Sequence, residues 1–188
     1  MRVGGGRARG TRLRAKGGRG VRPTSTLVTD AVFNSLAPRI AGACVLDLFA
    51  GTGRLGIEAL SRGAREAVFV ERDPRHAALI RQNLAAAGLS GRGVVRRADA
   101  LAAVAAGEGE RRFDLIFLDP PYGRGLAAEA LRRVAAGTLL ASGGLVIAEG
   151  HWRDDPGEIA GLARVRTARY GETAVWVYAR AAGREEGA

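Results

Sequence analysis

The sequence predicts an α/β protein with a largely parallel sheet that helices cover on both faces. Short apolar runs typical of buried strands alternate with helical patterns along most of the 188 residues. Two of these runs, 45–49 and 115–118, lead directly into loops that carry glycine, proline and carboxylates. Because the loops that follow parallel strands meet at one edge of a sheet, we expect these two loops to face a common ligand-binding crevice.

The first expected element is a helix that follows the turn at Arg22–Ser25, is capped by Ser25 or Thr26, and runs to about Leu36. Strands are expected near 44–49, 67–71, 93–97, 114–118 and 144–149. Helices are expected near 53–62, 74–87, 99–106 and 125–136, with a weaker pattern at 156–162. Two antiparallel strands, about 164–169 and 173–179, turn at Gly171 and complete a sheet of seven strands.

The composition indicates a globular protein of one main domain. The hydrophobic fraction of 47% supports a sizeable core, and no apolar run approaches the ~20 residues of a membrane span. A single cysteine, Cys44, fits the reducing cytoplasm, and the two histidines lie too far apart to suggest a metal site. We therefore expect a cytoplasmic monomer with no bound metal and no membrane contact.

The positive charge is concentrated at the N-terminus. The net charge is +10, and the first 22 residues hold eight of the 29 basic residues but none of the 19 acidic ones. We expect a basic arm at 1–22, a catalytic domain at 23–180 and a flexible tail at 181–188. Such an arm suits a polyanion such as RNA. The alternative is a disordered solubilising tail, but recurring glycines and the spaced Val3 and Leu13 favour a hairpin. The candidate RNA-binding residues are Arg2, Arg7, Arg9, Arg12, Arg14, Lys16, Arg19, Arg22, Thr24 and Ser25.

The loop after the first expected strand suits a nucleotide-like cofactor. Residues 51–56 form a G-x-G-x-x-G pattern, and Glu71, 20 residues after Gly51, can accept hydrogen bonds from ribose hydroxyls. Asp47 can bind an ammonium group, and Asp99 can accept from an adenine amino group or simply cap a helix. Three carboxylates suit S-adenosylmethionine better than a dinucleotide, whose pyrophosphate they would repel. The candidate cofactor-binding residues are Asp47, Phe49, Ala50, Gly51, Thr52, Gly53, Glu71, Arg72, Asp99 and Ala100.

The loop after the fourth expected strand, Asp119-Pro120-Pro121-Tyr122, suits methyl transfer to an amino nitrogen. Such a nitrogen is a poor nucleophile because its lone pair is delocalised into the ring. The Asp119 carboxylate and the Pro120 carbonyl can accept its two hydrogens, which directs the lone pair at the methyl group. Pro121 stiffens the turn, and Tyr122 can stack on the base. A simple proline turn at the end of a strand is the alternative.

From Arg2 to about Ala179 the chain resembles the RsmD family, which methylates a guanine N2 of small-subunit (16S) ribosomal RNA. The segments that carry the resemblance lie in the arm and at 22–25, 31–34, 47–53, 60–64, 69–73, 118–122 and 170–173. The Asp-Pro-Pro-Tyr motif also occurs in adenine-N6 and glutamine methyltransferases. Its combination with Arg22-Pro23-Thr24-Ser25 and a basic arm is more specific.

The resemblance implies a class I methyltransferase fold, Rossmann-like and seven-stranded, with a small basic N-terminal extension. It also implies S-adenosylmethionine as cofactor and 16S ribosomal RNA, in the small subunit or an assembly intermediate, as partner. Two other kinds of function remain open. One is a different amino-methyltransferase, acting on DNA adenine or protein glutamine, and the other is a basic RNA-binding protein without activity.

Overall fold

The computed structural model describes residues 1–15, 26–107 and 109–181 of the chain. The strands are β1 Cys44–Leu48, β2 Glu66–Val70, β3 Gly93–Arg96, β4 Phe113–Leu118, β5 Leu140–His151, β6 Leu162–Tyr170 and β7 Thr173–Arg180. The helices are α1 Thr26–Ile40, α2 Arg54–Ser61, α3 Pro74–Ala86, α4 Ala100–Ala106 and α5 Leu126–Ala136, with a short 3₁₀ turn η1 at Ser90–Arg92.

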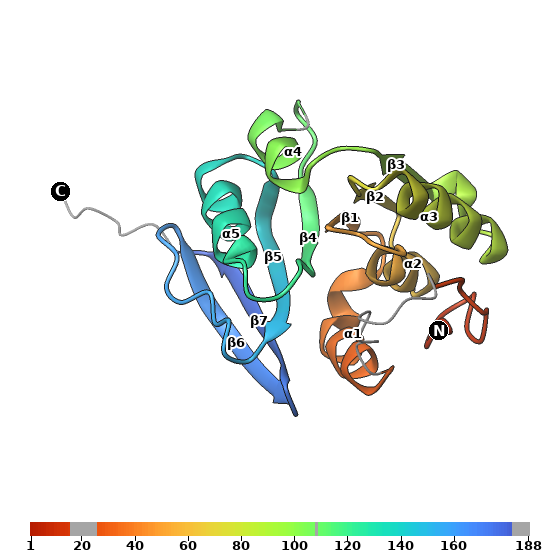
Figure 1. Ribbon diagram of the computed structural model, residues 1–188, viewed down its shortest axis with the longest axis horizontal. Coiled ribbons are helices and arrows are strands. Elements are labelled where there is room, and N and C mark those ends of the chain that lie inside the picture. The colour runs from red at the N-terminus through yellow and green to blue at the C-terminus, as the bar shows by residue number, and fades with distance from the viewer. Residues whose placement is uncertain (16–25, 108, 182–188) are drawn as a thin grey trace.

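The seven strands form one sheet in the order β3-β2-β1-β4-β5-β7-β6 (Figure 1). Strands β1 to β5 pair in parallel, whereas β7 runs antiparallel to both β5 and β6. The chain reverses its direction of winding between β1 and β4, because β2 and β3 lie on one side of β1 and β4 lies on the other. This arrangement confirms the predicted fold class.

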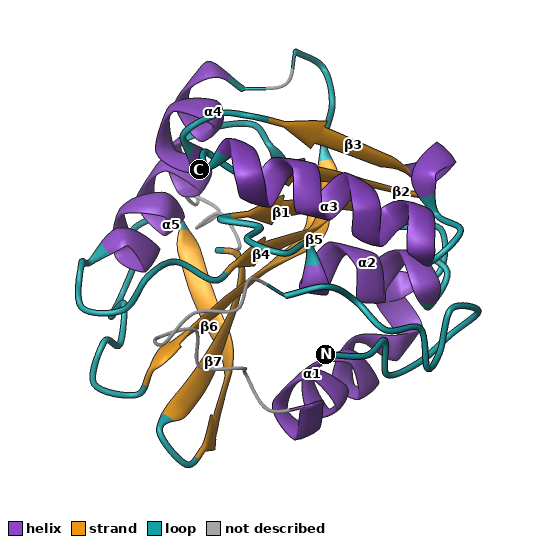
Figure 2. Cartoon of the chain, turned by 45° about the vertical axis from the view of Figure 1, so that its right-hand side comes forward, coloured by secondary structure: helices purple, strands orange, loops and turns teal. Residues whose placement is uncertain are grey.

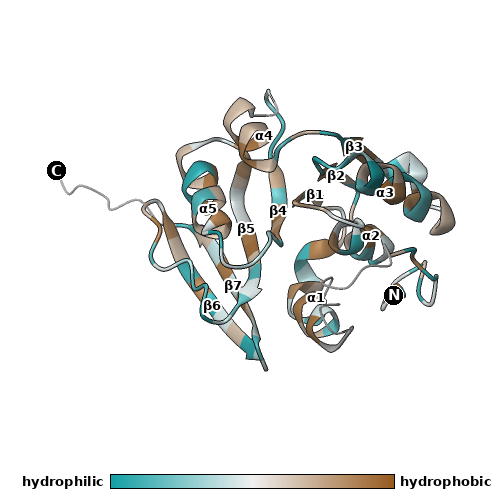
Figure 3. Cartoon of the chain, viewed as in Figure 1, coloured by the Kyte–Doolittle hydropathy of each residue, from teal (hydrophilic) through white to brown (hydrophobic). Residues whose placement is uncertain are grey.

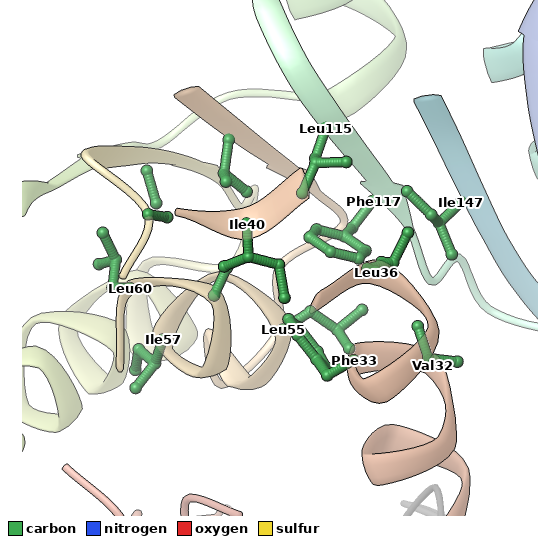
Figure 4. Packing of buried hydrophobic residues seen from close by; sticks show 14 of the residues in the cluster. Val32, Phe33, Leu36, Ile40, Leu55, Ile57, Leu60, Leu115, Phe117 and Ile147 are labelled. Carbon is green, nitrogen blue, oxygen red and sulfur yellow. The ribbon is translucent and has the colours of Figure 1, made fainter. Parts of the chain in front are cut away.

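Helices cover both faces of the sheet (Figure 2). On one face of the sheet, a hydrophobic cluster joins α1, α2 and α3 to every second residue of the strands. On the other face, a second cluster joins α4 and α5 to the strand residues that point the opposite way. Figure 4 shows the first cluster, in which Phe33 and Ile40 of α1 meet Leu60 of α2 and Phe117 of β4. Figure 3 shows hydrophobic and hydrophilic positions along the same helix in α3, as a helix that packs on a sheet requires.

Two sequence predictions need correction. The helix expected at 156–162 is absent, because Pro156 and the positive-φ glycines Gly157 and Gly161 break it, and an isolated bridge joins Ile159 to Leu162 instead. The first helix does not end near Leu36. It continues through Pro38 to Ile40, whose side chain is 2% exposed in the core.

The beginning of the arm is a folded hairpin that packs against the helices on one face of the sheet. Arg2 and Arg12 pair as an antiparallel bridge, and Val3 and Leu13 are buried in the same cluster as α1 to α3. The expected hairpin is therefore present at the start of the arm. The candidate RNA-binding residues Lys16, Arg19, Arg22, Thr24 and Ser25 lie outside the described residues.

Hydrogen bonds from α2 hold this hairpin in place. The Glu58 carboxylate accepts from the backbone N–H groups of Gly4 and Gly5, both at 2.8 Å. The Ser61 hydroxyl accepts from Ala8 N at 2.9 Å. Within the described ranges no helix is both long enough and apolar enough to span a membrane.

Candidate active site

The carboxyl ends of β1, β2, β4 and β5 lie at one edge of the sheet, where the winding reverses. Open α/β sheets bind their ligands at this edge. Both loops singled out in the sequence are found here, because one follows β1 and the other follows β4. The prediction that the two loops lie at the same edge of the sheet is therefore confirmed.

The glycine loop is held by backbone hydrogen bonds to its neighbours. Asp47, 1% exposed near the end of β1, accepts from Gly56 N at 2.9 Å, and Ala50 N donates to the Val70 carbonyl at 3.0 Å. Within the described ranges, Phe49 is the non-glycine residue with a positive φ, at 59°. Such a conformation is costly for a bulky residue, and it occurs here two residues before Gly51, at the start of the glycine loop.

Glu71 connects the glycine loop to the start of α3. Its carboxylate accepts from Gly51 N and from Asp73 N, both at 2.8 Å, and the residue is 8% exposed. Each carboxylate oxygen has a second lone pair. Glu71 therefore lies where it can order the loop and also accept hydroxyl groups from a bound ligand.

The other candidate cofactor residues lie at the start of α4 and directly after Glu71. Asp99 caps α4, since its carboxylate accepts from Ala102 N at 3.0 Å, and Ala100 begins that helix as a buried residue. The helix-capping interpretation of Asp99 is thus confirmed, whereas its contact with an adenine stays a prediction. Arg72 is exposed beside Glu71.

The loop after β4 brings acidic groups close together. The register pairs Leu118 with Ala148, so Asp119 lies beside Glu149, which is 4% exposed. Burial raises the pKa of Asp119 to about 7, and the negative charge of Glu149 contributes, while Arg54 opposes the shift. Arg54 Nη2 lies 3.6 Å from Glu149 Oε2.

Asp47 belongs to the same electrostatic cluster. Burial raises its pKa to about 8, and the charges of Asp119 and Glu71 add to the shift, although the Gly56 N–H and Arg54 act in the opposite direction. Asp47, Asp119 and Glu149 therefore all lie within the electrostatic influence of Arg54. A positively charged ligand would lower both raised pKa values, and a pyrophosphate would be repelled.

Tyr122 begins an aromatic surface beside these carboxylates. Its side chain is 40% exposed, and its ring lies 6.3 Å from that of His151, which stacks on Trp152 at 5.9 Å. The Arg169 guanidinium lies 4.1 Å from the centre of the Trp152 ring. Next to Tyr122, Gly123 N donates to the Asp154 carboxylate at 2.8 Å. This bond fixes the loop against the end of β5.

The two prolines between Asp119 and Tyr122 differ in exposure, with Pro120 buried and Pro121 exposed. Neither proline has an N–H to compete for nearby acceptors. This portion of the loop can therefore present a carbonyl beside the Asp119 carboxylate, as the sequence suggested.

Asn83, which the sequence analysis missed, links the arm to the glycine loop. The residue is 0% exposed in the last turn of α3. Its Oδ1 accepts from Arg14 N at 2.8 Å, and its Nδ2 donates to the Arg14 carbonyl at 3.1 Å and the Thr52 carbonyl at 2.9 Å. One buried amide group therefore connects the end of the hairpin with the second residue of G-x-G-x-x-G.

Basic residues of the arm border a shallow groove against α3. The groove has a volume of about 610 Å³ and is lined by Arg12, Arg14, Arg75 and His76 among others. Arg2, Arg7, Arg9, Arg12 and Arg14 are all exposed, as RNA-binding residues must be. Because α3 begins next to Glu71, this groove leads from the arm toward the glycine loop.

Arg54, Glu149 and His151 were not among the predicted site residues. Glu149 follows the same rule that identified Asp119, since both lie at the carboxyl ends of strands, and an acidic residue closing the fifth apolar run was a usable signal. For Arg54 the sequence offers no such signal. Only the position of β5 beside β4 brings its side chain to Glu149.

A family model described as "Conserved hypothetical protein 95" matches residues 1–179. The chain is 39% identical to the "Putative rRNA methyltransferase YlbH" of Bacillus subtilis, with 95% of this chain and 98% of that protein covered. It is 36% identical to the Ribosomal RNA small subunit methyltransferase D of Escherichia coli, with 79% and 74% covered.

Among solved structures, the "Putative methyltransferase yhhF from Escherichia coli" superposes with a TM-score of 0.84 at 32% identity. The alignment covers 97% of this chain and 98% of that one, so the similarity includes the arm as well as the sheet. The family match, the curated relatives and this structure agree along nearly the whole length of the protein. The chain therefore belongs to the RsmD family.

Proposed function

We propose that this protein transfers a methyl group from S-adenosylmethionine to the exocyclic N2 of a guanine in small-subunit ribosomal RNA. The names of its relatives support an rRNA methyltransferase. The observation that carries the finer proposal is the placement of Asp119 and Glu149 side by side, at the strand edge that also holds the glycine loop.

The charges at this edge fit S-adenosylmethionine. Bound there, this cofactor supplies an electrophilic methyl group on a sulfonium, and it also carries an ammonium group. Asp47 is buried and Asp119 is half-buried, and both have raised pKa values, so a cationic ligand stabilises their charged forms. Glu71 retains lone pairs for ribose hydroxyls beside the turn at Gly51. The residues therefore suit a cofactor with two positive groups and a ribose.

Two neighbouring acceptors favour guanine over adenine. On its Watson–Crick edge guanine presents two adjacent donors, N1–H and the N2 amino group, whereas adenine presents its amino group beside an acceptor nitrogen. Asp119 and Glu149 can accept from both guanine donors, and the Pro120 carbonyl can accept the second amino hydrogen. The N–CH₃ bond forms as the S–CH₃ bond breaks. The methylated nitrogen would then lose a proton to solvent or to the Asp119 carboxylate.

The exposed aromatic groups suit an unstacked base. Tyr122 and His151 flank the end of β5, and the arginine over Trp152 adds positive charge at the same surface. Bases flipped out of single-stranded loops are held by stacking of this kind. The start of the arm lies beside α2 and α3, away from β6 and β7 (Figure 1), whereas His151 pairs with Thr173 of β7 and Arg169 belongs to β6, so RNA can cross the carboxylates between the arm and the aromatic surface.

The test of the chemistry is methylation of small subunits, naked 16S ribosomal RNA and DNA with labelled S-adenosylmethionine, followed by nucleoside analysis. We expect N2-methylguanosine from small-subunit RNA. Asp119→Ala should lower turnover about 100-fold or more, as removal of one positioned polar group from a transition state does. Glu110→Ala, which removes an exposed carboxylate just before the start of β4, should methylate at the wild-type rate. Label in N6-methyladenosine or in protein glutamine would refute the proposal.

The arm is tested by substitution, because deleting it would remove the two backbone N–H groups that Glu58 accepts and would expose the apolar face around Val3. Replacing Arg7, Arg9 and Arg12 together by Ala should weaken RNA binding. It should also reduce the slope of log K against log salt by about 2, since each lost contact to single-stranded phosphate removes about 0.7. The matching triple Lys variant keeps the charge and should retain most of the slope. An unchanged slope in the Ala variant would show that the arm does not contact phosphates.

A further inference from the structure

Arg54 is a largely buried arginine whose two terminal guanidinium nitrogens lack hydrogen-bond partners among the described residues. Its side chain is 13% exposed, and neither Nη1 nor Nη2 has a hydrogen-bond partner there. The nearest acid, Glu149, is 3.6 Å from Nη2, which is too long for a hydrogen bond. A guanidinium carries five N–H donors, and buried polar groups of folded proteins are nearly always satisfied. These free donors therefore call for an acceptor that a ligand provides.

The charges around Arg54 restrict what this acceptor can be. Asp47, Asp119 and Glu149 already give the site an excess of carboxylates, so a ligand with several negative charges, such as a pyrophosphate, would be repelled. A ligand that fits must bring more positive than negative charge, with one anionic group near the arginine. The amino-acid part of S-adenosylmethionine has this pattern, since it combines a sulfonium, an ammonium and a single carboxylate.

We propose that Arg54 binds the carboxylate of the methionine part of S-adenosylmethionine. The inference rests on the proposed function and adds a specificity-determining residue to it. The planar fork of a guanidinium can hold a carboxylate through two parallel N–H···O bonds, which a lysine cannot do. Arg54 follows Gly53 directly, so the same turn that gives the cofactor loop its shape also delivers this donor.

A simpler alternative is that Arg54 only neutralises the carboxylates around it. Its charge does oppose the raised pKa values of Asp47 and Asp119. The two roles predict different results for a ligand that lacks its carboxylate. If Arg54 acts only through its charge, Arg54→Lys, which keeps that charge, should keep the full preference for the ligand with a carboxylate. If the guanidinium fork binds the carboxylate, Arg54→Lys should lose part of this preference and Arg54→Ala should lose all of it.

The experiment measures the affinities of S-adenosylmethionine and decarboxylated S-adenosylmethionine by calorimetry, in the full chain and in Arg54→Ala and Arg54→Lys. The wild-type protein should prefer the intact cofactor by roughly 10- to 100-fold, the size of a lost charge-assisted hydrogen bond. Arg54→Ala should bind both ligands with similar affinity, and Arg54→Lys should keep part of the preference. S-adenosylhomocysteine and its decarboxylated form should show the same pattern, because neither contains the sulfonium.

A preference that persists undiminished in Arg54→Ala, or is absent from the wild type, would overturn the assignment while leaving the methyltransferase proposal intact. Failure of the wild type to bind either S-adenosylmethionine or S-adenosylhomocysteine would instead refute the proposed function. Thermal unfolding of each variant checks that the fold survives. If Arg54→Ala does not fold, the charge-conserving Arg54→Lys becomes the deciding variant. Loss of the planar guanidinium fork alone must then reduce the preference for S-adenosylmethionine over its decarboxylated form.

Discussion

Replacing Asn83 by Ala should loosen the arm and the glycine loop at the same time. The side chain makes three hydrogen bonds, two to Arg14 and one to the Thr52 carbonyl, from a position without solvent exposure. An unsatisfied buried group costs about 1–3 kcal/mol, and water can reach the groups of Arg14 more easily than that of Thr52. We therefore expect a loss of about 2–4 kcal/mol in the free energy of unfolding. For a chain of this size that corresponds to roughly 4–16 °C in Tm.

The control is Gln82→Ala on the neighbouring position of α3. Gln82 is exposed and accepts one hydrogen bond from the Arg14 guanidinium at 3.1 Å, so its loss should change stability by no more than about 0.5 kcal/mol. Denaturant unfolding and calorimetry of S-adenosylmethionine binding would be run on both variants. Each kcal/mol taken from the ordered loop lowers cofactor affinity by up to about fivefold. The reasoning fails if Asn83→Ala matches Gln82→Ala in stability and in cofactor affinity.

Gly56→Ala should destabilise the protein by about 1–3 kcal/mol in denaturant unfolding, because the added Cβ collides with the aromatic ring behind it on β2, whereas Gly91→Ala has open space and should be neutral. Equal stability of these two variants would contradict the packing argument. Glu71→Gln should weaken S-adenosylmethionine binding by about 1–3 kcal/mol in calorimetry, since an amide cannot accept at both of its ends, and unchanged affinity would remove Glu71 from the site. Cofactor binding should release protons and tighten as the pH rises from 6 to 8, because Asp47 and Asp119 have raised pKa values of about 8 and 7 and the bound cation favours their charged forms. The same raised pKa values stabilise the ligand-free fold at low pH, and that contribution to stability is lost as the pH rises through 7 to 8. Calorimetry of cofactor binding in buffers of different ionisation enthalpy measures the number of protons released. Uptake of protons on binding would contradict the prediction.

The positions at the ligand edge that the sequence predicted correctly are those with a local pattern. Asp47 lies near the end of one apolar run and Asp119 directly follows another, and a polar residue at such a point of a parallel strand lies at the edge where ligands bind. The G-x-G-x-x-G spacing likewise depends on one turn and one helix start. Such features need no knowledge of which strands become neighbours.

The residues that were missed depend on contacts between distant segments. Arg54 and Glu149 approach each other only because β5 lies next to β4, and Asn83 acquires its role only because the arm folds back onto α3. The false helix at 156–162 has a related cause. Ile159 and Leu162 have helical spacing, but they reach the core from a short bridge that leads into β6.

The docked hairpin also has a consequence for the thermodynamics of RNA binding. Basic tails that order only on contact with nucleic acid lose conformational entropy at that moment, which offsets part of their attraction to phosphate. Here Glu58 and Ser61 already fix the backbone that carries Arg7 and Arg9, so this cost is met during folding. A few exposed arginines can therefore contribute nearly their full electrostatic attraction, and the protein can approach its RNA without waiting for the start of the arm to fold.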